Sequence, residues 1–165
     1  MNITFPDGAI KEYPKNITPI EIAESISHGL AKQIVVAKVN DELVDLNFEI
    51  VEDAKIMFFK FDSEEGRSVY WHSTAHLLAQ AVRTLFPDVK VTIGPSIENG
   101  FYYDFDKEIP FTDDDLQKIE QKMKELAKLK NIYKREELSK QEAIDKFQKM
   151  GENYKLELLA DIPND

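Results

Sequence analysis

Two histidines stand four residues apart in the stretch VYWHSTAHLLAQAVRTLF. Imidazole is the side chain best suited to moving a proton near neutral pH. The apolar periodicity predicts an amphipathic helix over residues 69–86, stopped by Pro87. Because each helical residue turns about 100°, His72 and His76 would lie about 40° apart, at the rim of the apolar face. This is a position where a cleft could form.

The histidine pair has three interpretations. In the first, one ring packs against the core and the other is solvated, which is common for this spacing. In the second, the pair binds zinc. A zinc protease would show Glu after the first histidine, however, and here Ser-Thr-Ala separates His72 from His76. In the third, neutral imidazoles act as acid–base or water-positioning groups. Spacing alone does not separate the last two.

Two later stretches hold other residues that could take part in chemistry. The stretch GPSIENGFYYD predicts a hairpin at Asn99-Gly100. Its glycines would let a ligand approach closely, and its tyrosines could stack on a base or fill a core. In YKLELL, which has the pattern of a strand, Lys155 could pair with a phosphate or a carboxylate, although most such lysines are solvated.

Helices with clear start and stop signals surround these stretches. Thr112 is predicted to cap a helix over 112–130, with three aspartates in its first turn and lysines in its last, the order that the helix dipole favours. Ser139, Glu142 and Gly151 predict the start and end of another helix. These elements and the hairpin form a second unit, which begins with the histidine helix.

Residues 1–62 predict a separate unit. A hairpin turns at Pro6-Asp7-Gly8, and a helix follows with Thr18 as N-cap and Glu21 completing a capping box. Three further β-type runs follow, so we expect a small α+β sheet with one helix packed on it. The polar stretch DSEEGRS predicts a linker near residues 62–68.

Composition excludes several classes of protein. The chain has 165 residues, 42% of them hydrophobic, which is enough for one or two packed domains. It contains no cysteine, so disulfides, thiolate nucleophiles and Cys-based zinc sites are excluded within these residues. The net charge of −10 makes it a poor nucleic-acid binder by itself. No apolar run is long enough to cross a bilayer and no signal peptide is visible, so we expect a soluble cytoplasmic protein.

The combination WHSTAHLLAQAV…GPSIENGFYYDFD resembles threonyl-tRNA synthetase of the bacterial type, and the resemblance covers essentially the whole chain. Residues 1–62 are similar to the TGS domain, a ubiquitin-like β-grasp module. Residues 63–165 are similar to the N-terminal part of the editing domain of the same enzyme. The resemblance implies an α+β fold and a role in hydrolysing mischarged seryl-tRNA(Thr).

The resemblance also implies roles for individual residues. His72 and His76 match the two histidines of the family's editing motif, and Lys155 matches the lysine near the scissile ester. Gly94 and Tyr103 match positions that line the pocket for the terminal adenosine and the aminoacyl group. The family's editing pocket works without a metal, which lowers the weight of the zinc interpretation.

One departure from the family pattern bears on activity. The family completes its pocket with a later Asp and a C-x-x-x-H motif, and neither the Cys nor a later His is present here. We therefore expect an N-terminal fragment of a threonine–tRNA ligase that is inactive alone and carries no cofactor or metal. ATP, Mg and zinc would bind in the absent catalytic core. The partner tRNA(Thr) would bind to the full-length enzyme, which we expect to be a homodimer. The alternative is a non-catalytic RNA- or protein-binding module.

Overall fold

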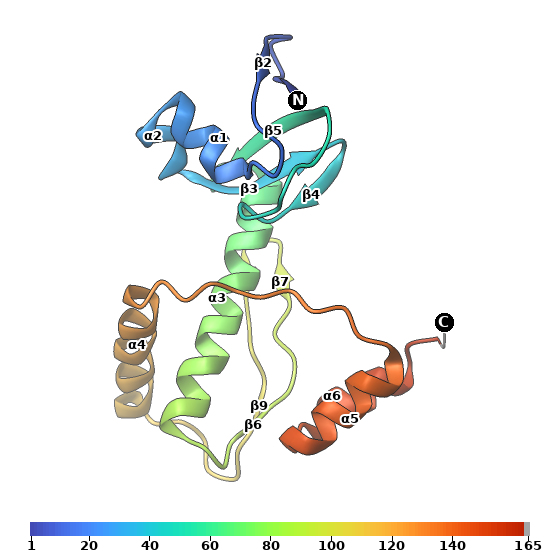
Figure 1. The fold of residues 1–165 in the computed structure, drawn as a ribbon. Coiled ribbons are helices and arrows are strands. Elements are labelled where there is room, and N and C mark those ends of the chain that lie inside the picture. The colour runs from blue at the N-terminus through green and yellow to red at the C-terminus, as the bar shows by residue number, and fades with distance from the viewer. Residues whose placement is uncertain (164–165) are drawn as a thin grey trace. The chain divides into compact units, whose positions relative to one another are not determined.

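The computed structural model describes residues 1–163 of an α+β chain that forms two compact units, Met1–Trp71 and His72–Asp165 (Figure 1). The long helix α3 (Glu64–Leu85) contributes its first turns to one unit and the remainder to the other. Both units combine helices with β-structure, which confirms the predicted fold class.

The first unit is a five-stranded mixed sheet with the helix α1 packed on it. The strands lie in the order β2-β1-β5-β3-β4. The neighbours β1 and β5 are parallel, and all other neighbours are antiparallel. Its elements before α3 are β1 (Asn2–Thr4), β2 (Ile10–Glu12), α1 (Pro19–Ile26), α2 (His28–Ala31), β3 (Ile34–Val39), β4 (Glu42–Val44) and β5 (Ala54–Lys60). This confirms the sheet with one packed helix predicted for residues 1–62.

Local signals set the ends of these elements. The Thr18 hydroxyl caps α1 by accepting a bond from the Glu21 amide, and the Glu21 carboxylate accepts a bond from the Thr18 amide, so the predicted capping box is present. Asn40 and Asp41 join β3 to β4 with φ values of 47° and 71°, as a tight hairpin turn requires. The core beneath is one apolar cluster, made of Ile3, Ile17, Ile22, Ala37, Val39, Ile50, Ala54 and Ile56.

The stretch predicted as a linker is instead the start of α3. The Ser63 hydroxyl accepts a bond from the Gly66 amide, and two glutamates fill the first turn, so the helix begins at Glu64 and not at residue 69. Gly66 suggested a break because glycine weakens helices. At this position a Cβ would lie 1.8 Å from the Lys60 carbonyl oxygen, so close packing explains the glycine.

The second unit is built on the remainder of α3. Two short antiparallel ladders, β6–β9 and β7–β8, form an extended hairpin, and three helices follow. Helix α4 runs beside α3, and the two share an apolar cluster around Val82 and Ile119 with the hairpin side chain Phe105 (Figure 1). The elements are β6 (Lys90–Val91), β7 (Ser96–Ile97), β8 (Gly100–Phe101), β9 (Phe105–Asp106), α4 (Asp113–Lys128), α5 (Lys140–Met150) and α6 (Asn153–Ala160).

The predicted starts of α4 and α5 are confirmed, and the predicted strand at YKLELL is wrong. Capping boxes at Thr112 and Ser139 begin the two helices. Gly151 ends α5 in the left-handed conformation, with φ of 71°. The chain then starts a new helix, α6, because Lys, Leu, Glu and Ala all favour helix and no strand of residues 1–163 pairs with this stretch.

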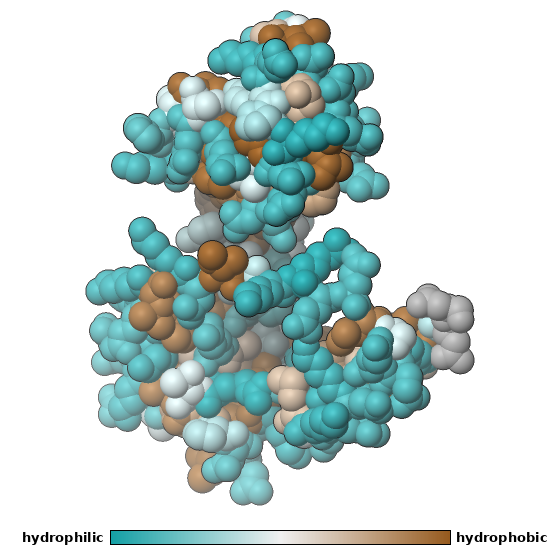
Figure 2. Space-filling model, viewed as in Figure 1, coloured by the Kyte–Doolittle hydropathy of each residue, from teal (hydrophilic) through white to brown (hydrophobic). Residues whose placement is uncertain are grey.

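Polar side chains cover most of the surface in view, with apolar residues in scattered patches (Figure 2). Within the described residues, no helix is both long and apolar enough to cross a membrane.

Candidate functional site

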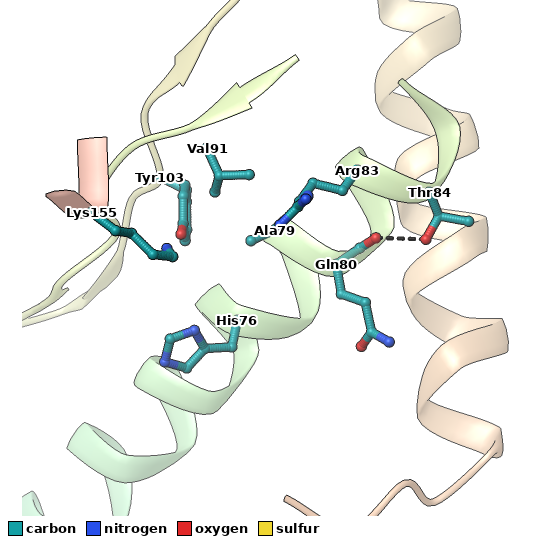
Figure 3. A pocket seen from close by; sticks show the side chains of 8 residues that line it. All are labelled: His76, Ala79, Gln80, Arg83, Thr84, Val91, Tyr103 and Lys155. Atoms are coloured by element: carbon teal, nitrogen blue, oxygen red, sulfur yellow. Dashed lines mark hydrogen bonds between the residues drawn. The ribbon is translucent and has the colours of Figure 1, made fainter. Parts of the chain in front are cut away.

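The second unit contains a cavity of about 420 Å³ against one face of α3 (Figure 3). Three separate segments form it: the helix α3, the hairpin of β6–β9 and the first turn of α6. Two of its lining residues are cations, and none is a carboxylate. The eight lining residues are His76, Ala79, Gln80, Arg83, Thr84, Val91, Tyr103 and Lys155.

The two histidines form a hydrogen-bonded pair at the edge of this cavity. Nε2 of His76 lies 3.0 Å from Nε2 of His72, and the rings meet edge to face with centroids 4.5 Å apart. A bond between two ring nitrogens requires one donor and one acceptor, so both rings cannot be protonated together. The pair can therefore hold or pass a single proton. His76 lines the cavity, and His72 reaches it through His76.

The pKa of His76 lies below its ordinary value. Partial desolvation of the ring is the main cause, and the nearby His72 and Lys155 add positive charge that lowers the pKa further. The imidazole is therefore held neutral near pH 7. A neutral ring can accept a proton from water, which a protonated ring cannot do.

Tyr103 forms the wall that faces the helix, and Gly94 makes room for it. The Tyr103 ring stacks on Phe105, with centroids 4.9 Å apart and an angle of 23°. A Cβ on Gly94 would lie 2.1 Å from Cδ2 of Tyr103, so only glycine fits behind this ring. The pKa of Tyr103 is raised by burial first and by the Glu152 carboxylate second, while Arg83 opposes the shift. The phenol thus stays a neutral donor.

Lys155 enters the cavity from the first turn of α6, on the side of the Tyr103 ring away from Arg83 (Figure 3). Its ammonium group offers three hydrogen-bond donors and a positive charge. Opposite it, Arg83 of α3 donates to the buried carboxylate of Glu152, which is only 7% exposed. The cavity therefore combines a neutral imidazole, a phenol, the Lys155 ammonium group and an arginine already paired with a carboxylate, a set that can bind an anionic or ester oxygen and orient water.

The structure brings together most of the residues selected from the sequence. His76, Tyr103 and Lys155 line one cavity, His72 bonds to His76, and Gly94 lies behind Tyr103 instead of lining the space. No group of three or more His, Cys, Asp or Glu within residues 1–163 is placed to hold a metal ion.

The residues predicted for the site do not include Arg83 or Glu152. A signal for Arg83 existed: it follows His76 by seven residues, which on a helix places both on one face, about 20° apart. Glu152 had no comparable signal, because a single Glu after a helix-ending glycine is usually solvated. Only the tertiary structure shows that its carboxylate is buried against Arg83.

Comparison with known proteins finds one domain family and several similar enzymes. The TGS domain family matches residues 1–60. The whole chain is 49% identical to threonine–tRNA ligase from Desulforamulus reducens over 165 residues, which is 100% of this chain and 26% of that protein. It is 48% identical to the enzyme of the same name from Anoxybacillus flavithermus over 163 residues, 99% of this chain and 25% of that protein.

A third relative is threonine–tRNA ligase from Citrifermentans bemidjiense. It is 48% identical over 165 residues, which is 100% of this chain and 26% of that protein. The chain thus spans about a quarter of the length of the curated relatives it matches. Its similarity is to their N-terminal part, which includes the TGS domain.

Proposed function

We propose that this chain, homologous to the N-terminal part of threonine–tRNA ligases, belongs to a cytoplasmic enzyme that joins threonine to tRNA(Thr) using ATP. Within that enzyme, we assign the second unit to proofreading, the hydrolysis of mischarged seryl-tRNA(Thr). Serine lacks one methyl group of threonine, and a missing methyl supplies only about 1–3 kcal/mol of binding discrimination. A second, hydrolytic site then lowers the error rate.

The observation that carries this proposal is the convergence of His76, Tyr103 and Lys155 on one cavity. They come from three segments of the chain, and a cavity of about 420 Å³ is within the size range of small-ligand sites. Its cationic lining contrasts with the net charge of −10. A local positive site in an acidic protein suits a ligand with phosphate and ester oxygens, such as the aminoacylated end of an RNA.

The proposed reaction is attack of water on the ester that joins serine to the terminal ribose. The water oxygen bonds to the acyl carbon, the bond from that carbon to the ribose oxygen breaks, and the ribose oxygen leaves as a hydroxyl after taking up the proton that the water gave up. The neutral His76 orders the water, and its bond to His72 lets the pair share the proton that the water releases. His72 also contacts the substrate or a ribose hydroxyl. Lys155 stabilises the charge that develops on the ester oxygen or orients the ribose. Gly94 and Tyr103 shape the space for the aminoacyl group and the adenosine.

The proposed site needs further residues for full activity. The resemblance implies a later Asp and a C-x-x-x-H motif, and these 165 residues include no cysteine. We therefore expect the chain alone to hydrolyse seryl-tRNA(Thr) poorly and not to aminoacylate tRNA. Robust hydrolysis by these 165 residues would show that the site is complete without the missing motif.

The test compares the full-length ligase with its His72→Ala and Lys155→Met variants. We expect both variants to accumulate serine on tRNA(Thr) while the rate of threonine activation stays unchanged. Lys124→Met, which removes an exposed ion pair on α4, is the control. If neither variant increases mischarging, the proofreading assignment is wrong, and a non-catalytic RNA- or protein-binding role becomes the better explanation.

A further inference from the structure

Helix α6 carries Lys155, and its apolar side chains are at most half-buried. None of the residues Asn153–Ala160 is buried, and the N-cap residue Glu152 makes no side-chain cap bond. By contrast, α4 buries Ile119 in the cluster it shares with α3. Since burial of apolar side chains is the usual source of helix docking, the placement of α6 needs another cause.

Two polar contacts join the start of α6 to other elements of its unit. Arg83 of α3 donates from Nη1 to Oε1 of Glu152. The Tyr154 hydroxyl donates to Oδ2 of Asp106 in β9, at 2.9 Å. Both contacts bridge segments far apart in the sequence, and they lie immediately before Lys155.

The Arg83–Glu152 contact is the stronger of these two. Glu152 is 7% exposed, and a buried carboxylate is costly unless a cation and hydrogen bonds compensate it. The Arg83 side chain is 46% exposed and supplies that compensation from the cavity wall. The Tyr154–Asp106 bond lies at the surface, where such contacts stabilise less.

Fixing Glu152 also fixes the backbone of Lys155. The Glu152 carbonyl oxygen accepts bonds from the amides of Lys155 and Leu156, both at 3.1 Å, so these three residues form one turn. On the other side, Arg83 and His76 lie on the same face of α3, two turns apart. The contact between Arg83 and Glu152 therefore places the first turn of α6, and with it Lys155, near the part of α3 that presents His76.

We propose that Arg83 and Glu152 are positioning residues, whose ion pair holds the first turn of α6 so that Lys155 faces His76 across the cavity. Neither residue is assigned a chemical step. The consequence for hydrolysis rests on the proposed function, but the geometric statement does not. The geometric statement is tested by a property of the chain itself, the pKa of His76.

The discriminating variant is Glu152→Ala in the 165-residue chain, with the His76 pKa measured by NMR titration. Removing an anion near the site would by itself lower the pKa of a neighbouring imidazole. Releasing Lys155 would raise it, because Lys155 is one cause of the lowered value. We expect a rise toward the ordinary value, with a rise in the same direction for Lys155→Met. Loss of the Glu152 charge alone would thus lower the His76 pKa, whereas release of Lys155 would raise it.

Three further variants support the interpretation. Glu152→Gln preserves the shape and an acceptor for Arg83, so we expect a smaller rise and a folded chain even if Glu152→Ala unfolds. Tyr154→Phe removes the surface bond, and we expect a smaller rise than with Glu152→Ala. Lys124→Met, which breaks the 2.5 Å pair with Glu120 inside α4, should leave the His76 pKa unchanged. An unchanged or lowered His76 pKa in both Glu152 variants would overturn the proposal.

Activity gives a second, separable readout in the full-length ligase. We expect Glu152→Ala to lower the rate constant of seryl-tRNA(Thr) hydrolysis on the order of ten- to a hundredfold, as a misplaced group typically does. Glu152→Gln should recover part of the rate. If Lys155→Met leaves hydrolysis intact, the proofreading function fails while the titration result stands. If Lys155→Met abolishes hydrolysis and the Glu152 variants do not change it, the positioning role fails.

Discussion

The two units are stabilised in different ways. The first has a five-stranded sheet and an apolar cluster of eight buried residues, and its capping bonds join residues close in sequence. The second has strands of two residues and a smaller cluster of four buried residues. Its polar contacts Arg83–Glu152 and Tyr154–Asp106 join segments that are 69 and 48 residues apart.

This difference has a functional consequence. In the first unit the buried apolar cluster holds the sheet and α1 together. In the second unit the cavity lies between segments that small numbers of polar bonds hold in place. Sites of chemistry are commonly drawn from the less stable parts of a structure, because groups must meet there that packing alone does not bring together. The following predictions test this contrast, from the largest expected effect to the smallest.

The largest effect is expected in the core of the first unit. Ile22 of α1 is fully buried against the sheet, so Ile22→Ala should lower the free energy of unfolding of this unit by about 2–5 kcal/mol. Ile10 of β2 is 64% exposed and is the matched control, since Ile10→Ala should change the free energy of unfolding by less than about 0.5 kcal/mol. Chemical denaturation measures both. Equal losses would mean that burial does not set the stability of this sheet.

An intermediate effect is expected where the second unit packs closely around its site. Gly94→Ala would place a Cβ 2.1 Å from the Tyr103 ring, so the ring must move, at a cost of about 1–3 kcal/mol. The displaced phenol loses its buried environment, and its raised pKa should fall toward the ordinary value. Denaturation and a spectroscopic titration of tyrosine measure the two effects.

Gly29→Ala in the first unit is the control for this substitution. Gly29 lies in α2, and its nearest neighbour would be Ser27 Oγ at 3.8 Å, an ordinary contact. Alanine leaves the unfolded chain fewer conformations than glycine does, which stabilises by about 0.4–1 kcal/mol where the folded backbone suits it, so the sign should reverse. Destabilisation by Gly29→Ala, or none by Gly94→Ala, would contradict the packing explanation.

The smallest effect concerns pH. The folded pKa of His76 lies below its unfolded value of 6.5, so between the two values the unfolded state binds more protons than the folded state. The free energy of unfolding should therefore decrease as pH falls from 6.5 through the folded pKa. His76→Asn should remove this part of the pH dependence. Urea titrations of both proteins at pH 7.5 and 5.5 test it; identical slopes for the two would exclude the effect.

Local signals in the sequence were enough to predict most of the helices. Each capping box joins residues three apart, so Thr18, Thr112 and Ser139 act wherever the rest of the chain lies. The same holds for Gly151 at the end of α5. Prediction was wrong where a local pattern is ambiguous. The stretch YKLELL alternates like a strand, but without a partner strand it forms the helix α6.

The prediction for the first turns of α3 was wrong for a related reason. Gly66 indicated a break, but the glycine reflects the closeness of the Lys60 carbonyl, which the sequence does not reveal. The spacing of His72 and His76 predicted that the two residues share one side of the helix, since i,i+4 neighbours do so. The bond between their rings is seen only in the structure.

The sequence by itself therefore determined the helix boundaries set by capping residues, the α+β class and the histidine pair, because each depends on interactions within about four residues. The tertiary structure alone decided that Lys155 and Tyr103 meet His76 and that Glu152 is buried beside Arg83. Those contacts depend on how separate segments pack. Their energies come from burial and from charge pairs between residues far apart in the sequence, which local sequence patterns do not encode.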